Sequence, residues 1–155
     1  TNRVIAATER PPSCSMRAVV DSSVVVKWFV RELGHDQALA LLDHQDELFA
    51  PDVIVSEVID AVWLRIIAGE IGNNQGSAIV TAITSGVPTL VPVSDLADEA
   101  FQAALKMNRL AHLAVYFACA DSLDAGFITA DEDAAFVAKE KLGADRVTFL
   151  SDLPS

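Results

Sequence analysis

The chain has 155 residues, of which 52% are hydrophobic, and a formal net charge of −11. This length predicts one domain with a substantial core, and no apolar run approaches the length of a membrane span. The acidic balance argues against tight, unassisted binding to a long polynucleotide, because Lys and Arg normally make the phosphate contacts. Carboxylates that hold divalent cations soften this objection, since a bound metal reverses the local sign of the charge.

The N-terminal segment differs in character from the rest of the chain. Residues 1–15 lack the continuous apolar stretch of a secretory signal and contain a pair of prolines. Met16 opens the first convincing strand, so we interpret 1–15 as a leader or added segment that is poorly ordered. Residues 16–155 then form the single domain, and a cytoplasmic location follows by default.

Hydrophobic periodicity divides the domain into alternating strands and helices. Strands are predicted at 17–20, 47–50, 89–93, 126–130 and 146–150. Helices are predicted at 24–31, 35–43, 52–68, 73–85, 95–107, 110–123 and 131–141. This alternation implies parallel pairing with helices on both faces of the sheet. The predicted fold class is therefore α/β, a three-layer α/β/α arrangement around a mainly parallel sheet of four to five strands.

Several polar residues are placed to begin helices. Asp21 and the two serines after it are predicted to cap the first helix, and Ser94 the helix at 95–107. Asn73 or Asn74 is predicted to cap the helix before it. Cys119 lies in an apolar helical pattern and is interpreted as a small core residue.

Three carboxylates stand out by their context. Asp21 follows the first strand, Glu57 lies early in the long helix after Pro51, and Asp131 ends the segment FITAD. In open parallel sheets, ligands bind beyond the carboxyl ends of the strands. Hard divalent cations prefer oxygen ligands, and Mg²⁺ takes few carboxylates while keeping several waters. For any one of these acids alone, helix capping or solvation is the better interpretation.

Three segments taken together resemble the PIN domain, in particular VapC-type toxin ribonucleases. They are VVDSSVVVKWFV, APDVIVSEVIDAV and VYFACADSLDAGFITADEDAAF, in the family's order, within a resemblance that spans nearly all of 16–150. The resemblance implies a sheet covered by helices on both faces and an acidic site that uses Mg²⁺ or Mn²⁺ to activate a water and cleave RNA. It also implies a cognate antitoxin and commonly a homodimer.

Residue by residue, the resemblance assigns catalytic and metal-binding roles to three acids. Asp21 matches the first acid of the family's V-D-x-S pattern, and Ser23 its neighbouring hydroxyl. Glu57 matches the acid of the E-x-x-N segment. Asp131 matches the acid of T-A-D, with Asp133 as a supporting candidate two residues later.

One position departs from the family's pattern. The family usually reads Y-D-A-x-Y-L-A-x-A, and its Asp is a further carboxylate of the metal site. Alignment on Tyr116 puts Leu113 at this acidic position, and no Asp or Glu lies between Glu99 and Asp121 to replace it. The loss of this oxygen should lower the affinity for a cation that is reluctant to shed water. A second metal, if the reaction uses one, is the more vulnerable.

Two residues are candidates to compensate for Leu113. Asp60 lies three residues after Glu57 on the same helix face, and a site role is weighed evenly against a solvated helix-surface carboxylate. His112 is a candidate to donate to phosphate or to ligate Mn²⁺, for which imidazole is a better match than for Mg²⁺. A partly buried histidine with a hydrogen-bond partner is the favoured interpretation of His112.

Other side chains have weaker functional interpretations. Lys27 is a candidate phosphate contact, although a solvated helix-face lysine is the favoured interpretation. Trp28 and Trp63 are candidates for base stacking, but packing or a subunit interface is favoured by their apolar neighbours.

Three functions compete at this stage. The leading hypothesis is a metal-dependent endoribonuclease of the toxin type, and the second is a catalytically impaired PIN-like domain that serves as a binding or regulatory module. The third is a phosphoacceptor receiver domain, which is ranked last because Asp21 stands alone after its strand and TLVPV ends without a well-placed Asp. The chain has no glycine-rich phosphate loop of the kind that triphosphate-binding enzymes use.

Overall fold

The central sheet has five strands, all parallel. The structure is a computed structural model that describes residues 17–44, 47–109 and 111–155. In these residues the strands are β1 (Arg17–Val20), β2 (Glu47–Pro51), β3 (Thr89–Val91), β4 (Gly126–Thr129) and β5 (Val147–Phe149), in the order β3-β2-β1-β4-β5. The predicted fold class is confirmed. The interpretation of 1–15 as a leader lies outside the described residues.

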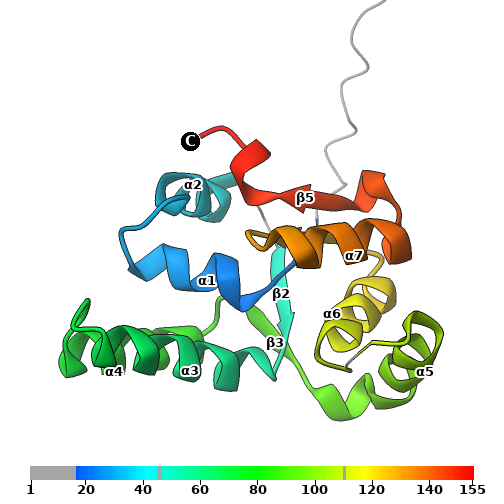
Figure 1. Ribbon diagram of the computed structural model, residues 1–155, viewed down its shortest axis with the longest axis horizontal. Helices are drawn as coiled ribbons and strands as arrows, with labels where there is room; N and C mark the ends of the chain where they lie inside the picture. Colours follow the sequence, from blue (N-terminus) through cyan, green and yellow to red (C-terminus); the bar gives the residue numbers. More distant parts are fainter. Residues whose placement is uncertain (1–16, 45–46, 110) are drawn as a thin grey trace, which may run out of the picture.

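Helices cover both faces of this sheet (Figure 1). They are α1 (Ser22–Phe29), α2 (His35–His44), α3 (Ile54–Ile67), α4 (Asn73–Ile83), α5 (Ala97–Met107), α6 (Ala111–Ser122) and α7 (Glu132–Leu142). Contacts join α1 to α2 and α3, and α3 to α4, in one layer; α6 contacts α5 and α7 in the other. The chain runs from β1 through β2 to β3 at one edge and then crosses to β4 and β5 at the other, and this reversal of direction puts the later helices on the opposite face. Within the described ranges, no helix has both the length and the apolar character needed to cross a membrane.

The helix cap predicted at Asp21 is confirmed, and the caps predicted at Ser94 and at Asn73 or Asn74 are wrong. Asp21 and Asp131 are the N-caps of α1 and α7, and each accepts a backbone N–H at its side chain. The predicted cap at Asn73 or Asn74 is wrong, because Gly72 occupies the N-cap of α4 and no side chain bonds there. A helix can begin without a side-chain cap where water satisfies its first amides.

The start of α5 also differs from the prediction. A 3₁₀ turn spans Val93–Asp95, and α5 begins only at Ala97, so Ser94 does not cap it. The backbone N–H of Val93 donates to the Asp52 carboxylate at 3.0 Å. Asp52 therefore holds the segment after β3 in a separate turn instead of beginning α3, as the sequence had suggested.

The core lies where α6 packs on the central strands. Residues from Ala114 to Ala120 are all buried, so α6 is apolar around its whole circumference. The rings of Phe117 and Phe127 meet edge to face, with centroids 5.5 Å apart, and both side chains are fully buried. Cys119 is buried in the same helix, which confirms its interpretation as a core residue.

This packing predicts the effect of truncating one ring. Phe117→Ala should lower the free energy of unfolding by about 3–5 kcal/mol, because it removes a buried ring and leaves a cavity against Phe127. Phe136→Ala is the matched control, since Phe136 on α7 is 63% exposed and its loss should change stability little. Urea denaturation of both variants measures the difference; equal midpoints would contradict this account of the core.

Candidate acidic site at the carboxyl ends of the strands

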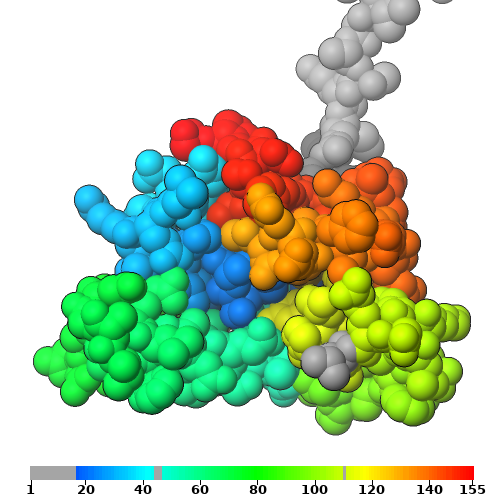
Figure 2. Space-filling model, in the orientation of Figure 1, coloured from blue at the N-terminus to red at the C-terminus, as the bar shows by residue number. Residues whose placement is uncertain are grey.

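The order of the strands brings three separate parts of the chain together at one edge of the sheet. β1 lies between β2 and β4, and Val20 is paired with Ile128, so Asp21 and Asp131 follow neighbouring strands. Glu57 lies in the first turn of α3, which follows β2. In the space-filling view, the start of α1 (blue) lies between the start of α3 (teal) and α7 (orange) (Figure 2).

Asp21 is a buried carboxylate held by two hydroxyl groups. Its side chain is 8% exposed. The Ser23 hydroxyl donates to Oδ1, and the Thr129 hydroxyl donates to Oδ2 from the neighbouring strand. The backbone N–H of Val24 also approaches Oδ1, at 3.4 Å. Both oxygens are therefore fixed in orientation.

The two hydroxyl groups are themselves oriented by backbone amides. The N–H of Ala130 donates to Ser23 Oγ at 2.9 Å, and the N–H of Asp131 donates to Thr129 Oγ1 at 3.1 Å. Each hydroxyl accepts one hydrogen bond and so directs its own proton toward Asp21. The end of β4 is thereby joined to the start of α1.

Burial changes the acidity of Asp21. Desolvation raises the pKa of this carboxyl from 3.8 to about 6, although the hydrogen bonds from Ser23, Thr129 and Val24 oppose the rise. The negative charge of Glu57 raises it further, which means that the two carboxylates are close enough to repel one another.

Glu57 is held in the same manner as Asp21. Ser22 Oγ donates to Oε2 at 3.2 Å, and the Tyr116 hydroxyl donates to Oε1 at 3.1 Å. Tyr116 is 2% exposed, and burial together with the charge of Glu57 raises the pKa of its phenol. The phenol therefore stays protonated and remains a donor to the carboxylate.

Asp131 is close to this network but takes a different role in it. Its Oδ1 accepts the N–H of Ala134 at 2.9 Å, as the N-cap of α7, and its side chain is exposed. Of the supporting candidates, Ser23 lies in the network, whereas Asp60 and Asp133 are exposed on α3 and α7.

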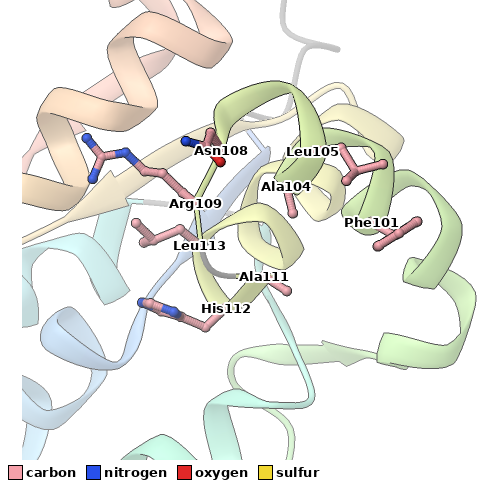
Figure 3. A pocket seen from close by; sticks show the side chains of 8 residues that line it. All are labelled: Phe101, Ala104, Leu105, Asn108, Arg109, Ala111, His112 and Leu113. Carbon is pink, nitrogen blue, oxygen red and sulfur yellow. The ribbon is translucent and has the colours of Figure 1, made fainter.

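His112 and Leu113 line a separate hollow of about 720 Å³ beside α5 and α6. Their side chains and that of Arg109 project to the same side of this helix pair (Figure 3). His112 is exposed, so the favoured interpretation as a partly buried histidine is wrong. Leu113 is partly buried and packs against the core. A short apolar side chain thus stands where the family's pattern has an acid.

The donor chemistry of the site can be compared with that of a divalent cation. In the part of the chain that the structure describes, no group of three or more His, Cys, Asp or Glu is arranged to hold a metal ion. Within the same residues, Asp21, Glu57 and Asp131 form no ion pair with Lys or Arg. Two oriented carboxylates without a basic partner fit a hard cation that keeps most of its waters. That Asp131 joins them on one cation remains a prediction.

Sequence reasoning did not single out three members of this network, which are Ser22, Tyr116 and Thr129. Thr129 is the residue before Ala130-Asp131, so its position on a buried strand end was a usable signal. Tyr116 is the one hydroxyl within the apolar run from Ala114 to Ala120, and a buried phenol normally needs a partner. The partners themselves lie too far away in the sequence to be inferred locally.

Comparisons with known proteins agree with this architecture. A family model described as PIN domain matches residues 18–140, and the chain belongs to the PIN domain family. A search of curated proteins gives no match.

Solved structures with the same fold come from several organisms. PAE2754 from Pyrobaculum aerophilum is 18% identical, with a TM-score of 0.64 over 86% of this chain and 83% of that one. VapC20 from Mycobacterium tuberculosis, a "Sarcin-Ricin loop cleaving toxin", is 16% identical, with a TM-score of 0.63 over 81% and 97%. A toxin-antitoxin complex from Klebsiella pneumoniae is 15% identical, with a TM-score of 0.60 over 86% and 97%. At these identities the likeness shows the fold.

The buried carboxylate predicts how stability depends on pH. A pKa raised from 3.8 to about 6 means that the folded state holds this proton more tightly, so the stability that Asp21 contributes is fully present below about pH 4 and is lost as the pH rises through 6. The rise corresponds to about 3 kcal/mol. Asp21→Asn should therefore be more stable than the unaltered protein above pH 6, by up to this amount, and the advantage should shrink toward pH 4.

Thermal or urea denaturation across this pH range measures the difference. Asp98→Asn, an exposed acid on α5, is the control and should show no such pH-dependent gain. If Asp21→Asn behaved like Asp98→Asn at every pH, Asp21 would not be the desolvated carboxylate described above.

Proposed function

We propose that this protein is a divalent-metal-dependent endoribonuclease of the toxin–antitoxin type. The observation that carries the proposal is the pair of Asp21 and Glu57, two carboxylates held by hydroxyl donors at the carboxyl edge of a PIN-family sheet. Within the described ranges, neither forms an ion pair with Lys or Arg. The Mycobacterium toxin and the Klebsiella toxin-antitoxin complex support it, because both share this fold.

The residues of the chain supply position and charge. Asp21 and Glu57 are the proposed metal-binding residues, with Asp131 as the third. When bound, Mg²⁺ or Mn²⁺ would activate a water and neutralise charge on the phosphodiester. Ser23 and Thr129 keep both oxygens of Asp21 in fixed directions, and the donors to Glu57 do the same for that carboxylate. A site oriented in advance loses little free energy to reorganisation when its ligand arrives.

The proposal includes protein partners and a location. A cognate antitoxin and a second copy of the chain are the proposed partners, and the cytoplasm is the proposed compartment. Support comes from α3, where Ile59, Trp63, Leu64 and Ile67 are 44–67% exposed. Contiguous apolar surface on a helix is typical of a face that another protein covers. The interpretation of Trp63 as an interface residue is compatible with this exposure.

Cleavage of RNA tests the proposed activity. The purified protein should cleave RNA in Mn²⁺ or Mg²⁺, and Asp21→Asn should reduce the rate by at least about 1,000-fold, since it removes a metal-binding charge. Asp98→Asn should cleave at the unaltered rate because Asp98 is exposed on α5, outside the acidic network. Labelled RNA on a denaturing gel is the measurement. Full cleavage in excess EDTA would defeat the proposal.

A second candidate function has a specific observation in its favour. Leu113 packs against the core at the position of a family carboxylate, and the described residues hold no three-acid group arranged for a metal. These features suit a catalytically impaired PIN-like domain that acts as a binding or regulatory module.

Restoring the missing acid separates the two functions. If the domain is impaired, Leu113→Asp should raise the affinity for Mn²⁺ by at least about tenfold, which corresponds to about 1.4 kcal/mol of binding free energy from one added ligand. The rate of RNA cleavage should rise with it. Leu113→Asn is the matched control, because it has the same size but no charge. Calorimetric titration with Mn²⁺ measures affinity and stoichiometry; equal affinities for both variants would count against impairment.

A further inference from the structure

A hollow of about 260 Å³ opens directly beside the acidic network, between α1, α3 and the end of β4. Its polar lining comes from Ser22, Ser23, Lys27, Glu32, Arg65 and Asp131. Ser22 and Ser23 are the hydroxyl donors to Glu57 and Asp21, so the hollow begins where the proposed metal site ends. Its far wall has a different chemistry.

That far wall consists of two basic side chains, Lys27 and Arg65, which are joined by the carboxylate of Glu32. Glu32 Oε1 accepts from Lys27 Nζ at 3.0 Å, and Glu32 Oε2 accepts from Arg65 Nη2 at 2.7 Å. All three side chains are 18–26% exposed, so the groups are reachable from solvent yet held in place. One carboxylate thus holds two cations by short hydrogen bonds.

Arg65 in particular is not fully satisfied. Among the residues that the structure describes, its buried Nε finds no hydrogen-bond partner. Glu70 approaches this atom only to 3.9 Å and is 59% exposed, so it contributes a weak, screened attraction. Nε itself is too buried for a ligand in the hollow to reach, so a phosphate would accept from the partly exposed remainder of the guanidinium, whose planar fork suits phosphate oxygens.

The helices place these cations in a line with the acidic residues. Ser23 and Lys27 are four residues apart on one face of α1, and Glu57 and Arg65 are eight residues apart on one face of α3. At 1.5 Å per residue, the basic groups lie roughly 6–12 Å farther along the helices than the acidic ones. Both helices therefore lead from the acidic network to the basic wall in the same direction.

A chain with a net charge of −11 must concentrate its few cations wherever it holds a polyanion. Among the described residues that line this hollow, Lys27 and Arg65 are the basic ones. We propose that Lys27 and Arg65 bind an RNA phosphate next to the one at the acidic site, and that Glu32 positions both cations while competing with the phosphate for them. This inference rests on the proposed function and assigns the direction in which the RNA strand leaves the site.

The competing interpretation is a structural ion pair that joins the loop after α1 to α3. In that case Lys27 and Glu32 matter for stability alone, and their removal leaves RNA affinity unchanged. The two interpretations make opposite statements about Glu32. If the ion pair is structural, Glu32→Gln does not raise the affinity for RNA. If Glu32 competes with phosphate for the two cations, Glu32→Gln raises that affinity.

The experiment measures RNA binding without cleavage. Fluorescence anisotropy with a labelled single-stranded RNA of mixed sequence is recorded in the Asp21→Asn background over a range of salt. Lys27→Met should weaken binding about tenfold, as the loss of one charge-assisted contact does, and should reduce the salt slope by about 0.7. Glu32→Gln should strengthen binding severalfold. Lys106→Met, an exposed lysine on α5, is the control and should bind as the background does.

The outcomes separate a failure of this inference from a failure of the proposed function. Equal affinity of Lys27→Met and Lys106→Met, with no gain in Glu32→Gln, would overturn the inference. If Lys27→Met is poorly folded by thermal denaturation, Glu32→Gln decides the question because it keeps both cations: a severalfold gain in affinity supports the phosphate contact, and binding equal to that of Lys106→Met overturns it. RNA cleavage that depends on Asp21 but is indifferent to Lys27 would remove this inference alone. Absence of any RNA binding and cleavage would remove the proposed function as well.

Discussion

The hydrogen bond from Thr129 to Asp21 is the interaction on which the rest of the site depends. It joins the ends of two adjacent parallel strands, where Asp21 directly follows β1 as a buried carboxylate. The free energy needed to desolvate that carboxylate is only partly offset by its hydroxyl partners, as its raised pKa shows. A buried acid beside a second acid is a poor choice for stability alone. A binding site for a cation would require such an acid at a strand end.

The architecture explains how residues far apart in the sequence reach this edge. Because β1 lies in the middle of the order β3-β2-β1-β4-β5, both of its neighbours contribute their following segments to the same end of the sheet. The carboxylates and the hydroxyls that orient them come from β1–α1, α3, α6 and β4. The basic wall of Lys27, Glu32 and Arg65 extends the same arrangement outward along α1 and α3. Lys27 thus lies one turn beyond Ser23 on α1, and Arg65 lies about two turns beyond Glu57 on α3.

Much of this could be predicted from the sequence, and the limits have physical causes. Hydrophobic periodicity and composition predicted the bounds of the described strands and α-helices to within a few residues, because a parallel sheet that helices cover on both faces has clear apolar runs in its sequence. Caps were predictable where a strand ends directly in an acid, as at Asp21 and Asp131, but not at Ser94, where a distant carboxylate holds the backbone. The Tyr116–Glu57 hydrogen bond spans 59 residues, and nothing local encodes it. Exposure of His112 was missed for a similar reason, since it depends on how α5 and α6 are packed.

Tyr116 gives the site a mechanical property. Its phenol comes from α6, in one helical layer, and its acceptor belongs to α3, in the other, so a single hydroxyl crosses the rim of the sheet. The orientation of Glu57 is consequently set by the spacing between the two layers, because neither the rigid ring nor the first turn of a helix can stretch to follow a displacement. A bound protein that changed the spacing between these layers would therefore change the orientation of Glu57 without contacting it.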